Sequence, residues 1–332
     1  MFEVIDLFCG AGGMSRGLEL AGLAIQAGVD VNPLCIETYK YNFPNARAIC
    51  GSVVDICAAD IKNLLSGTKP FVLAGCPPCQ LFSQLHRSIR PVGDEFGHYL
   101  RLVWALRPDY LVFENVPRIV DYEQAWKLLL SRLRRLGYCV AYRIVSAESF
   151  GVPQRRKRLV LVAARSRIEF NEPPLLPTQT VRNAIGGLPY EDESIPNHIT
   201  MKLSLANYLR MRSTPCDGGR SKTGQTAFSD SYGRMRWDYP APTITTRCIS
   251  FSNGSFGHPE YDRAITVREA ALLQGFESDF RFFGGVWETA KQVGNAVPPP
   301  IAKWLGENIA LHHQSHKVET VRNSSRSRST EC

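Results

Sequence analysis

The sequence contains no long apolar run. No stretch approaches the roughly 20 consecutive apolar residues that a membrane-spanning helix requires. The first residues show neither a basic leader nor a cleavage site, so we expect no signal peptide. The ten cysteines are scattered rather than spaced like those of a small disulfide-bonded scaffold. Together these absences predict a cytoplasmic protein whose thiols stay reduced.

The sequence also lacks internal repeats and a second pair of metal-ligating cysteines. Cys76 and Cys79 form one Cys-x-x-Cys pair, which by itself is only half of a zinc site. The adjacent His312 and His313 are poorly spaced to complete it, so we predict no metal site. A redox pair is a further alternative, although two prolines occupy the spacer and such a pair needs an exposed first cysteine at a helix start.

Acidic residues are in the minority, with 31 Asp or Glu against 39 Lys or Arg. The net charge of +8 favours a polyanionic partner such as nucleic acid, which basic side chains bind through its phosphates. A merely soluble basic protein would have the same balance. The 332 residues suit one large domain and a smaller one.

The first 165 residues alternate short apolar strands with helical patterns. This alternation favours an α/β fold with a mostly parallel, doubly wound sheet and helices on both faces. Strands are expected at 4–8, 24–30, 71–74, 110–113, 140–145 and 159–163, and helices at 14–21, 33–41, 99–106 and 122–136.

The composition changes after residue 165. Residues 202–236 are rich in Gly, Ser and Thr and carry seven Lys or Arg against two Asp, with aromatic residues interspersed. We interpret 166–240 as a separate lobe that faces a polyanion, with a solvated basic loop region as the alternative. Residues 241–313 are expected to rejoin the domain formed by 1–165, through helices over 266–276 and 300–311. The polar residues 314–332 predict a disordered tail.

Cys79 lies in the run Gly-Cys-Pro-Pro-Cys-Gln-Leu-Phe-Ser at 75–83. An apolar strand leads into this run, and two prolines fix the backbone just before the thiol. A thiol held rigidly at a strand end is typical of a nucleophile, since cysteine attacks as a thiolate along a fixed line. The alternative is a small buried apolar residue, which most cysteines are.

A glycine-rich turn at 6–13 follows the first strand and opens a helix. Glycines there let a ligand approach the backbone N–H groups at the helix start. The spacing differs from the dinucleotide-binding pattern. Asp30 ends the next strand, where a carboxylate can accept both hydroxyls of a ribose. The two features together predict a site for an adenosine-containing cofactor.

Two further polar groups adjoin predicted strands. Glu114 ends the strand over 110–113, where desolvation should raise its pKa so that the protonated carboxyl can donate to a ring nitrogen. An exposed strand-end acid is the alternative. Four cations at 155–158 precede the strand over 159–163, and alternation places Arg156 and Arg158 on one face. Such a cluster before a buried strand is costly unless an anion or a polar ligand meets it.

With these pieces assembled, the chain strongly resembles the cytosine-C5 DNA methyltransferases, of the bacterial type. The resemblance covers almost the whole chain and implies the Rossmann-like methyltransferase fold, with a variable target-recognition domain at 166–240. Its motifs, in the family's order, are Asp-Leu-Phe-Cys-Gly-Ala-Gly-Gly at 6–13, Pro-Pro-Cys-Gln at 77–80, Glu-Asn-Val at 114–116, Gln-x-Arg-x-Arg at 154–158, Pro-Ala-Pro-Thr-Ile-Thr-Thr at 240–246, Arg-Glu-Ala-Ala-Leu-Leu-Gln-Gly-Phe at 268–276 and Gln-Val-Gly-Asn-Ala-Val-Pro at 292–298.

The resemblance implies a role for each site residue. Cys79 would attack C6 of a flipped cytosine, Glu114 would hold N3 and the exocyclic amine, and Arg158 would hold O2 with Arg156 close by. S-adenosylmethionine would supply the methyl group. The implied cofactor contacts are Phe8, Gly10, Ala11, Gly12, Gly13, Asp30, Ser52, Val53, Pro78 and Asn295. The implied DNA contacts are Gln80, Ser83 and Asn115.

The chain departs from the family pattern in two places. Members usually have Gly-Asp-Ile after the third strand, with the acid on the adenine, whereas this chain has Gly-Ser-Val at 51–53. Asp55 is the candidate substitute. Cys76 adds a second thiol just before the Pro-Pro-Cys-Gln motif, and we expect it to be structural.

The resemblance favours a nucleoid-associated monomer that methylates a short duplex sequence in a bacterial cytoplasm, with a companion restriction endonuclease as a possible functional partner. A tRNA cytosine-5 methyltransferase is an alternative, but that branch has a Cys-Phe-Thr signature that is absent here. A catalytically silent DNA-binding member is another, against which the intact Pro-Pro-Cys-Gln and Glu-Asn-Val motifs argue.

Overall fold

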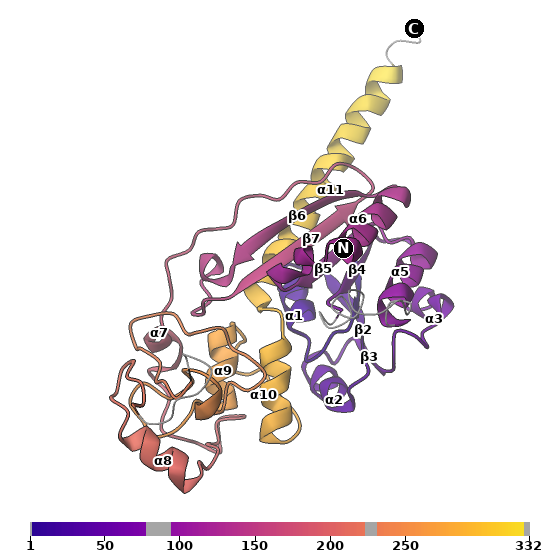
Figure 1. Cartoon of the computed structure of the whole chain (residues 1–332). Coiled ribbons are helices and arrows are strands. Elements are labelled where there is room, and N and C mark those ends of the chain that lie inside the picture. Colours follow the sequence, from indigo (N-terminus) through magenta and orange to yellow (C-terminus); the bar gives the residue numbers. More distant parts are fainter. Residues whose placement is uncertain (1, 78–93, 223–230, 329–332) are drawn as a thin grey trace.

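The computed structural model describes residues 2–77, 94–222 and 231–328. A central sheet with its helices forms one lobe, and a smaller lobe with little regular structure lies beside it (Figure 1). Within the described ranges, no helix is both long enough and apolar enough to cross a membrane.

The sheet has seven strands in the order β3-β2-β1-β4-β5-β7-β6. All neighbours pair in parallel except β7, which runs antiparallel to both β5 and β6. This confirms the predicted mostly parallel α/β fold. The strands are β1 (Glu3–Leu7), β2 (Ala24–Asp30), β3 (Arg47–Cys50), β4 (Phe71–Gly75), β5 (Tyr110–Asn115), β6 (Cys139–Ser146) and β7 (Lys157–Ala164).

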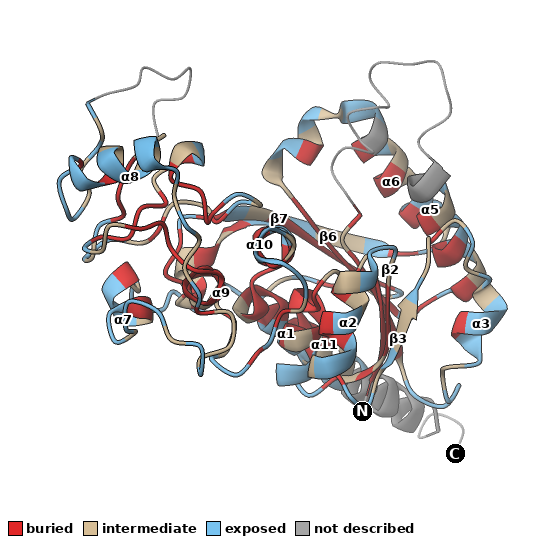
Figure 2. Ribbon diagram, turned by 90° about the horizontal axis from the view of Figure 1, so that it is seen from below, coloured by how far each residue is buried: buried red, intermediate tan, exposed pale blue. Residues whose placement is uncertain are grey.

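Successive residues of the central strands enter different cores, because side chains alternate between the faces of a sheet. Val4 packs in one apolar cluster and Ile5 in the other. The first cluster includes α1 (Gly13–Leu20) and α11 (Pro299–Arg328), and the second includes α3 (Ala58–Lys62), α5 (Asp94–Leu106) and α6 (Glu123–Arg135). Figure 2 shows the buried strands between these two helical layers. Helices therefore cover both faces, which explains why β1, β4 and β5 are buried throughout.

Helices from the two end regions of the described chain pack against each other. Helix α1 packs closely along α11, and a Cβ at Gly17 would lie 2.3 Å from the carbonyl oxygen of Pro299. That distance is far shorter than a van der Waals contact, so only glycine permits this approach. The start of α11 is thus fixed against the turn that follows β1.

The smaller lobe contains α7 (Val181–Ile185), α8 (Leu205–Arg212) and α9 (Val267–Gln274). Buried Arg234 organises much of it by donating to the carbonyls of Met211, Thr214, His258 and Tyr261. The lobe therefore extends well past the expected boundary at 240/241, because segments on both sides of that boundary share one hydrogen-bonded core. The expected capping box of α9, between Thr266 and Glu269, is present.

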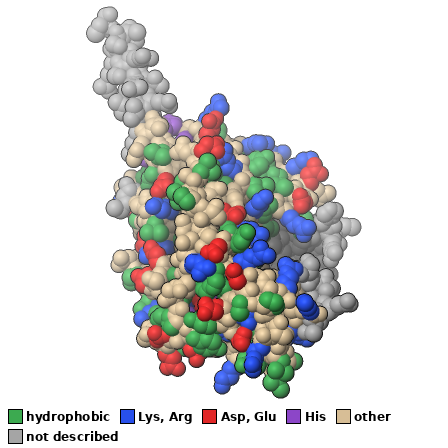
Figure 3. Space-filling view, turned by 90° about the vertical axis from the view of Figure 1, so that its left-hand side faces the viewer, with side chains coloured by type: hydrophobic (Ala, Val, Ile, Leu, Met, Phe, Trp, Pro, Cys, Tyr) green, Lys and Arg blue, Asp and Glu red, His purple; other side chains and the backbone are tan. Residues whose placement is uncertain are grey.

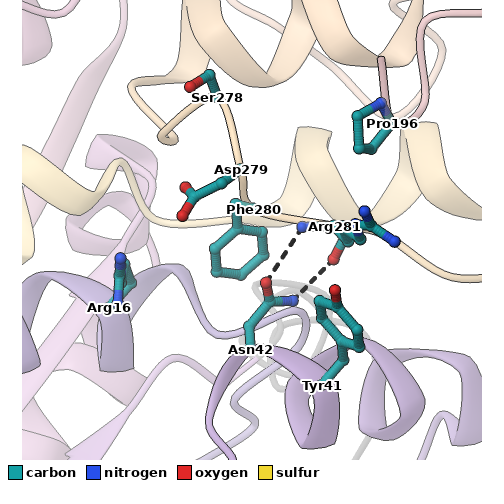
Figure 4. A pocket seen from close by; sticks show the side chains of 8 residues that line it. All are labelled: Arg16, Tyr41, Asn42, Pro196, Ser278, Asp279, Phe280 and Arg281. Atoms are coloured by element: carbon teal, nitrogen blue, oxygen red, sulfur yellow. Dashed lines mark hydrogen bonds between the residues drawn. The ribbon is translucent and has the colours of Figure 1, made fainter. Parts of the chain in front are cut away.

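Hydrogen bonds and an ion pair fasten the smaller lobe to the sheet domain beside a cavity of about 470 Å³ (Figure 4). The Asn42 amide at the end of α2 (Pro33–Asn42) donates to the Arg281 carbonyl at 2.7 Å and accepts from the Arg281 N–H at 3.1 Å. Arg16 of α1 pairs with Glu277 at 2.5 Å. These contacts tie α1 and α2 to the segment that follows α9.

Two helices are among the features that differ from the sequence expectations. Helix α10 (Val286–Asn295) was not predicted, because Gly284 and Gly285 precede it and Gly294 lies in its last turn. Helix α11 continues to Arg328, where a disordered tail was expected from residue 314. Residues 314–328 contain neither proline nor glycine, and extending an existing helix costs much less than starting one.

Candidate active site

A cavity of about 340 Å³ lies where the carboxyl ends of β1 and β2 meet α10. Ligands in open α/β sheets bind at this edge. Six of the predicted cofactor residues line it, namely Phe8, Gly10, Ala11, Gly13, Asp30 and Asn295. The sequence therefore identified residues from three separate segments that the fold brings to one cavity.

Asp30 connects the two strand ends that form the cavity floor. Its carboxylate accepts the N–H of Gly10 at 2.9 Å and the N–H of Asn32 at 2.8 Å. Burial raises its pKa, while these N–H donors act in the opposite direction. Each oxygen accepts one of these bonds and can accept another, so a ligand hydroxyl can still donate to the carboxylate.

Gly10 supplies the open side of the cavity. Its φ is +53°, and a Cβ built on it would meet no atom within 4 Å. Gly13 is different, because its Cβ would lie 2.3 Å from the carbonyl oxygen of Val297. Gly12 also serves packing, since its Cβ would lie 2.3 Å from the Phe43 ring, and it does not line the cavity. In this turn, therefore, Gly10 leaves space for a ligand, whereas Gly12 and Gly13 permit close packing.

Glu114 and Arg158 form a buried ion pair at the junction of β5 and β7. The Arg158 Nε lies 2.8 Å from Oε1 of Glu114. Antiparallel pairing explains this contact. Glu114 is opposite Val160 in the register, and Arg158 lies two residues from Val160 on the same face of β7. Desolvation raises the pKa of Glu114, and the charges of Arg158 and Arg156 oppose that rise. The net shift raises the pKa of Glu114 above its usual value.

Asn115 contacts the protein rather than facing solvent. It is buried, and its amide donates to the carbonyl of Pro77 at 2.9 Å. Pro77 directly precedes four predicted site residues, Pro78, Cys79, Gln80 and Ser83, all of which lie outside the described residues. The DNA contact that the resemblance implied for Asn115 stays a prediction, and the contact observed here is with the start of the Pro-Pro-Cys-Gln motif.

Arg156 donates to the backbone of other motifs. Its guanidinium donates to the carbonyls of Ile244 at 2.8 Å, Gly294 at 3.0 Å and Ala296 at 3.2 Å. Desolvation, followed by the charge of Arg158, lowers its pKa to about 9. Its Nη1 and Nη2 groups therefore donate to protein carbonyls, and Arg158 is the arginine that pairs with the acid.

Three predicted positions lie away from the cavity walls. Ser52 accepts the N–H of Val54, and Val53 is buried in the apolar cluster that Phe8 also contacts. Asp55 is exposed and does not line the cavity. An adenine contact from this segment therefore stays a prediction.

Three thiols and the unpredicted helix α10 complete the cavity wall. Cys9, Cys35 and Cys76 line it, and burial raises the pKa of each thiol. Protonated thiols are weak nucleophiles, so these cysteines can lie beside an electrophile. From α10 come Glu288, Lys291, Gln292 and Asn295. A signal for this set was present, because residues 288, 291, 292 and 295 share one face of a helix.

Comparison with known proteins identifies the family of this chain. The family profile for C-5 cytosine-specific DNA methylases matches residues 2–311. The Type II methylase M.HgiDII of Herpetosiphon aurantiacus is 34% identical, in a match that covers 96% of this chain and 98% of that protein. The Type II methyltransferase M1.HphI of Haemophilus parahaemolyticus is 32% identical over 92% of this chain and 86% of its own length.

A solved structure shows the same fold. It is a putative DNA modification methyltransferase encoded within a prophage (E. coli), with a TM-score of 0.76 and 24% identity, covering 93% of this chain and 99% of that one. The family assignment rests on the sequence matches to the profile and to the two relatives, and the fold of the solved structure agrees with it. The chain therefore belongs to the C-5 cytosine-specific DNA methylase family, as a DNA (cytosine-5)-methyltransferase of the bacterial Type II kind.

Proposed function

We propose that this enzyme transfers a methyl group from S-adenosylmethionine to C5 of a cytosine flipped out of a specific short duplex sequence, through a covalent bond between Cys79 and C6. The observation that carries the proposal is the shared wall between two sites. Cys76 lines the cavity, and β4 pairs in parallel with β5 so that Gly75, which precedes Cys76, is opposite Phe113, which precedes Glu114. The Glu114–Arg158 pair thus lies beside the cavity.

The chemistry requires residues of these types. C5 of neutral cytosine is a poor nucleophile, so Cys79 first adds to C6 and shifts electron density to C5. Protonated Glu114 donates to N3, and Arg158 donates to O2, which together stabilise the negative charge of the adduct. C5 would then take the methyl group as the donor leaves as S-adenosylhomocysteine, and the C5 proton would pass to a base such as water. Expulsion of the Cys79 thiolate restores the ring.

The cavity fits S-adenosylmethionine, which would supply an electrophilic methyl group. The missing Cβ of Gly10 leaves open space above the glycine-rich turn. Asp30 has acceptor capacity for ribose hydroxyls, and the half-buried ring of Phe8 offers an apolar surface to adenine. The neutral thiols of Cys9 and Cys76 would not compete for the methyl group.

The smaller lobe is proposed to select the target sequence. Its exposed cations, Lys202, Arg212, Arg220 and Arg236, can contact phosphates, whereas Arg234 is internal. Lys and Arg side chains border a hollow on the face shown in Figure 3. C5 is inaccessible inside a duplex, so the base must leave the stack. Replacing the lobe with that of another member should change the methylated sequence and preserve the reaction, and an unchanged target would refute this assignment.

We further propose that the enzyme acts as a monomer in the bacterial cytoplasm on nucleoid DNA, within a restriction-modification system. The Type II names of its relatives support this context. Bisulfite sequencing of DNA from cells with and without the gene gives the activity and the target together. DNA methylated in this way should resist a nuclease that cuts the same sequence.

The covalent mechanism is tested with Cys79→Ser and with 5-fluorocytosine DNA. The variant should lose methyl transfer but still bind S-adenosylmethionine. Wild-type enzyme should become trapped on the fluorinated duplex, because fluorine cannot leave as a proton does. Turnover by Cys79→Ser, or an active preparation that is not trapped, would exclude addition of Cys79 to C6.

A further inference from the structure

Arg156 is a buried cation without a carboxylate partner among the residues that the structure describes. It is 2% exposed, and its donors are directed at the three carbonyls of Ile244, Gly294 and Ala296. Burying a charge in this way is expensive unless the surroundings compensate. Two of these carbonyls lie where they can offset the cost of burying the Arg156 charge.

Gly294 and Ala296 lie at the C-terminal end of α10. The last carbonyls of a helix have no partner within the helix, and together they form the negative end of its dipole. Arg156 supplies both donors and positive charge to this end. Asn295, which lines the cavity, lies between the two carbonyls that Arg156 binds.

A second buried side chain, that of Gln274, also binds the C-terminal end of α10. Gln274, the last residue of α9, donates to the Ala296 carbonyl at 2.6 Å and accepts from Gln154 at 2.5 Å. The Gln154 oxygen in turn accepts the N–H of Ile244 at 2.7 Å. The end of α10 is therefore fixed both by the segment before β7 and by a helix of the recognition lobe.

We propose that Arg156 is a positioning residue for the methyl-donor site: by holding the C-terminal end of α10 it keeps Asn295 at the cavity wall, and Gln274 links that wall to the recognition lobe. This rests on the proposed function, in which the cavity binds S-adenosylmethionine. Arg156 therefore acts through Asn295 rather than on the cytosine.

The chain offers a matched control in Arg268. Arg268 is also a buried arginine that donates to three backbone carbonyls, those of Pro196 at 2.8 Å, Glu277 at 3.1 Å and Phe280 at 2.6 Å. Its contacts lie within the recognition lobe and its junction, and it does not line the cavity. Arg156→Met and Arg268→Met thus remove comparable contacts at two different places.

The experiment measures the Kd for S-adenosylmethionine by calorimetry in both variants and in wild-type enzyme. Arg156→Met should raise the Kd by about tenfold, equivalent to one charged hydrogen bond. Arg268→Met should leave it within about twofold of wild type, even if both variants melt at lower temperature. The Kd is the deciding quantity because the charge of Arg156 also influences Glu114, which would change kcat.

If either methionine variant fails to fold, Arg156→Lys and Arg268→Lys replace the pair, since lysine keeps the charge but cannot span three carbonyls. Gln274→Met should also raise the Kd for S-adenosylmethionine, as Arg156→Met does. Equal Kd values across a folded pair would overturn the positioning role. Failure of wild-type enzyme to bind S-adenosylmethionine would instead refute the proposed function.

Discussion

The Nε atom of Arg158 lies 2.8 Å from Oε1 of Glu114, and both side chains are largely buried. The arginine favours the ionised carboxylate, whereas desolvation, which is the larger effect, favours the protonated acid. The net effect raises the pKa of Glu114, which is the direction that suits the proposed donation to a ring nitrogen.

Replacing Glu114 with glutamine should lower kcat by about 10²–10³-fold, because the amide cannot transfer a proton to N3. Binding of S-adenosylmethionine should change little, since Glu114 does not line the cavity. Single-turnover methylation of a duplex measures the loss. Glu123→Gln, on the exposed face of α6, is the control and should retain full activity. A Glu114→Gln enzyme with normal kcat would remove this acid from the mechanism.

The alkaline limb of the pH–activity profile should belong to Glu114. Its raised pKa means that the donating form persists below that pKa and is lost as the pH rises through it. Arg158→Gln removes a charge that lowers this pKa, so the alkaline limb should move to higher pH. The lost contact to O2 should lower kcat at every pH. A limb that stays in place, measured as kcat against pH, would contradict the assignment.

Stability should decrease with rising pH because of Asp6. Its carboxyl group is buried, and desolvation raises its pKa to about 7, while the hydroxyl of Ser15 donates to it at 2.6 Å. Since the folded-state pKa lies above the unfolded one, the stabilisation is present in acid and is lost as pH rises through about 7. Asp6→Asn keeps an acceptor for Ser15 and should flatten the dependence by about 2–3 kcal/mol between pH 5 and 8 in urea unfolding.

Gly10→Ala should mainly weaken ligand binding, whereas Gly13→Ala should mainly lower stability. Alanine at Gly10 meets no atom within 4 Å, so it should reduce S-adenosylmethionine binding by filling the open side of the cavity, with a stability loss of only about 1 kcal/mol from its positive φ. Alanine at Gly13 would approach the Val297 carbonyl to 2.3 Å and should lower stability by several times as much. Calorimetric binding and thermal melting separate the two effects. The opposite pattern would show that Gly10 does not face the ligand.

The regular sheet was predictable because its strands are short apolar runs that end at polar residues. The expected range 24–30 matches β2, which ends at Asp30. Strand alternation put Arg156 and Arg158 on one face and Arg155 and Lys157 on the other, and in the structure the first two lie inside while the other two are exposed. It could not separate the inner two, because Arg156 contacts Gly294 and Ala296, far away in the sequence.

The smaller lobe was less predictable because its structure depends on internal polar contacts rather than on periodicity. Arg234 counted as one of the basic residues expected to face a polyanion, but it is 3% exposed and binds backbone carbonyls. For the Pro-Pro-Cys-Gln segment, in contrast, the sequence is informative and the structure is not. The motif identifies Cys79 as the nucleophile, and that residue lies outside the described ranges, so its role stays a prediction.

The packing of α1 against α11 has a consequence during synthesis. The glycine-rich turn is made early in translation, whereas Asn295 and Val297, which line the same cavity, are made much later. A product that stops before Asn295 lacks part of the cavity wall, so we expect it to bind no ligand there.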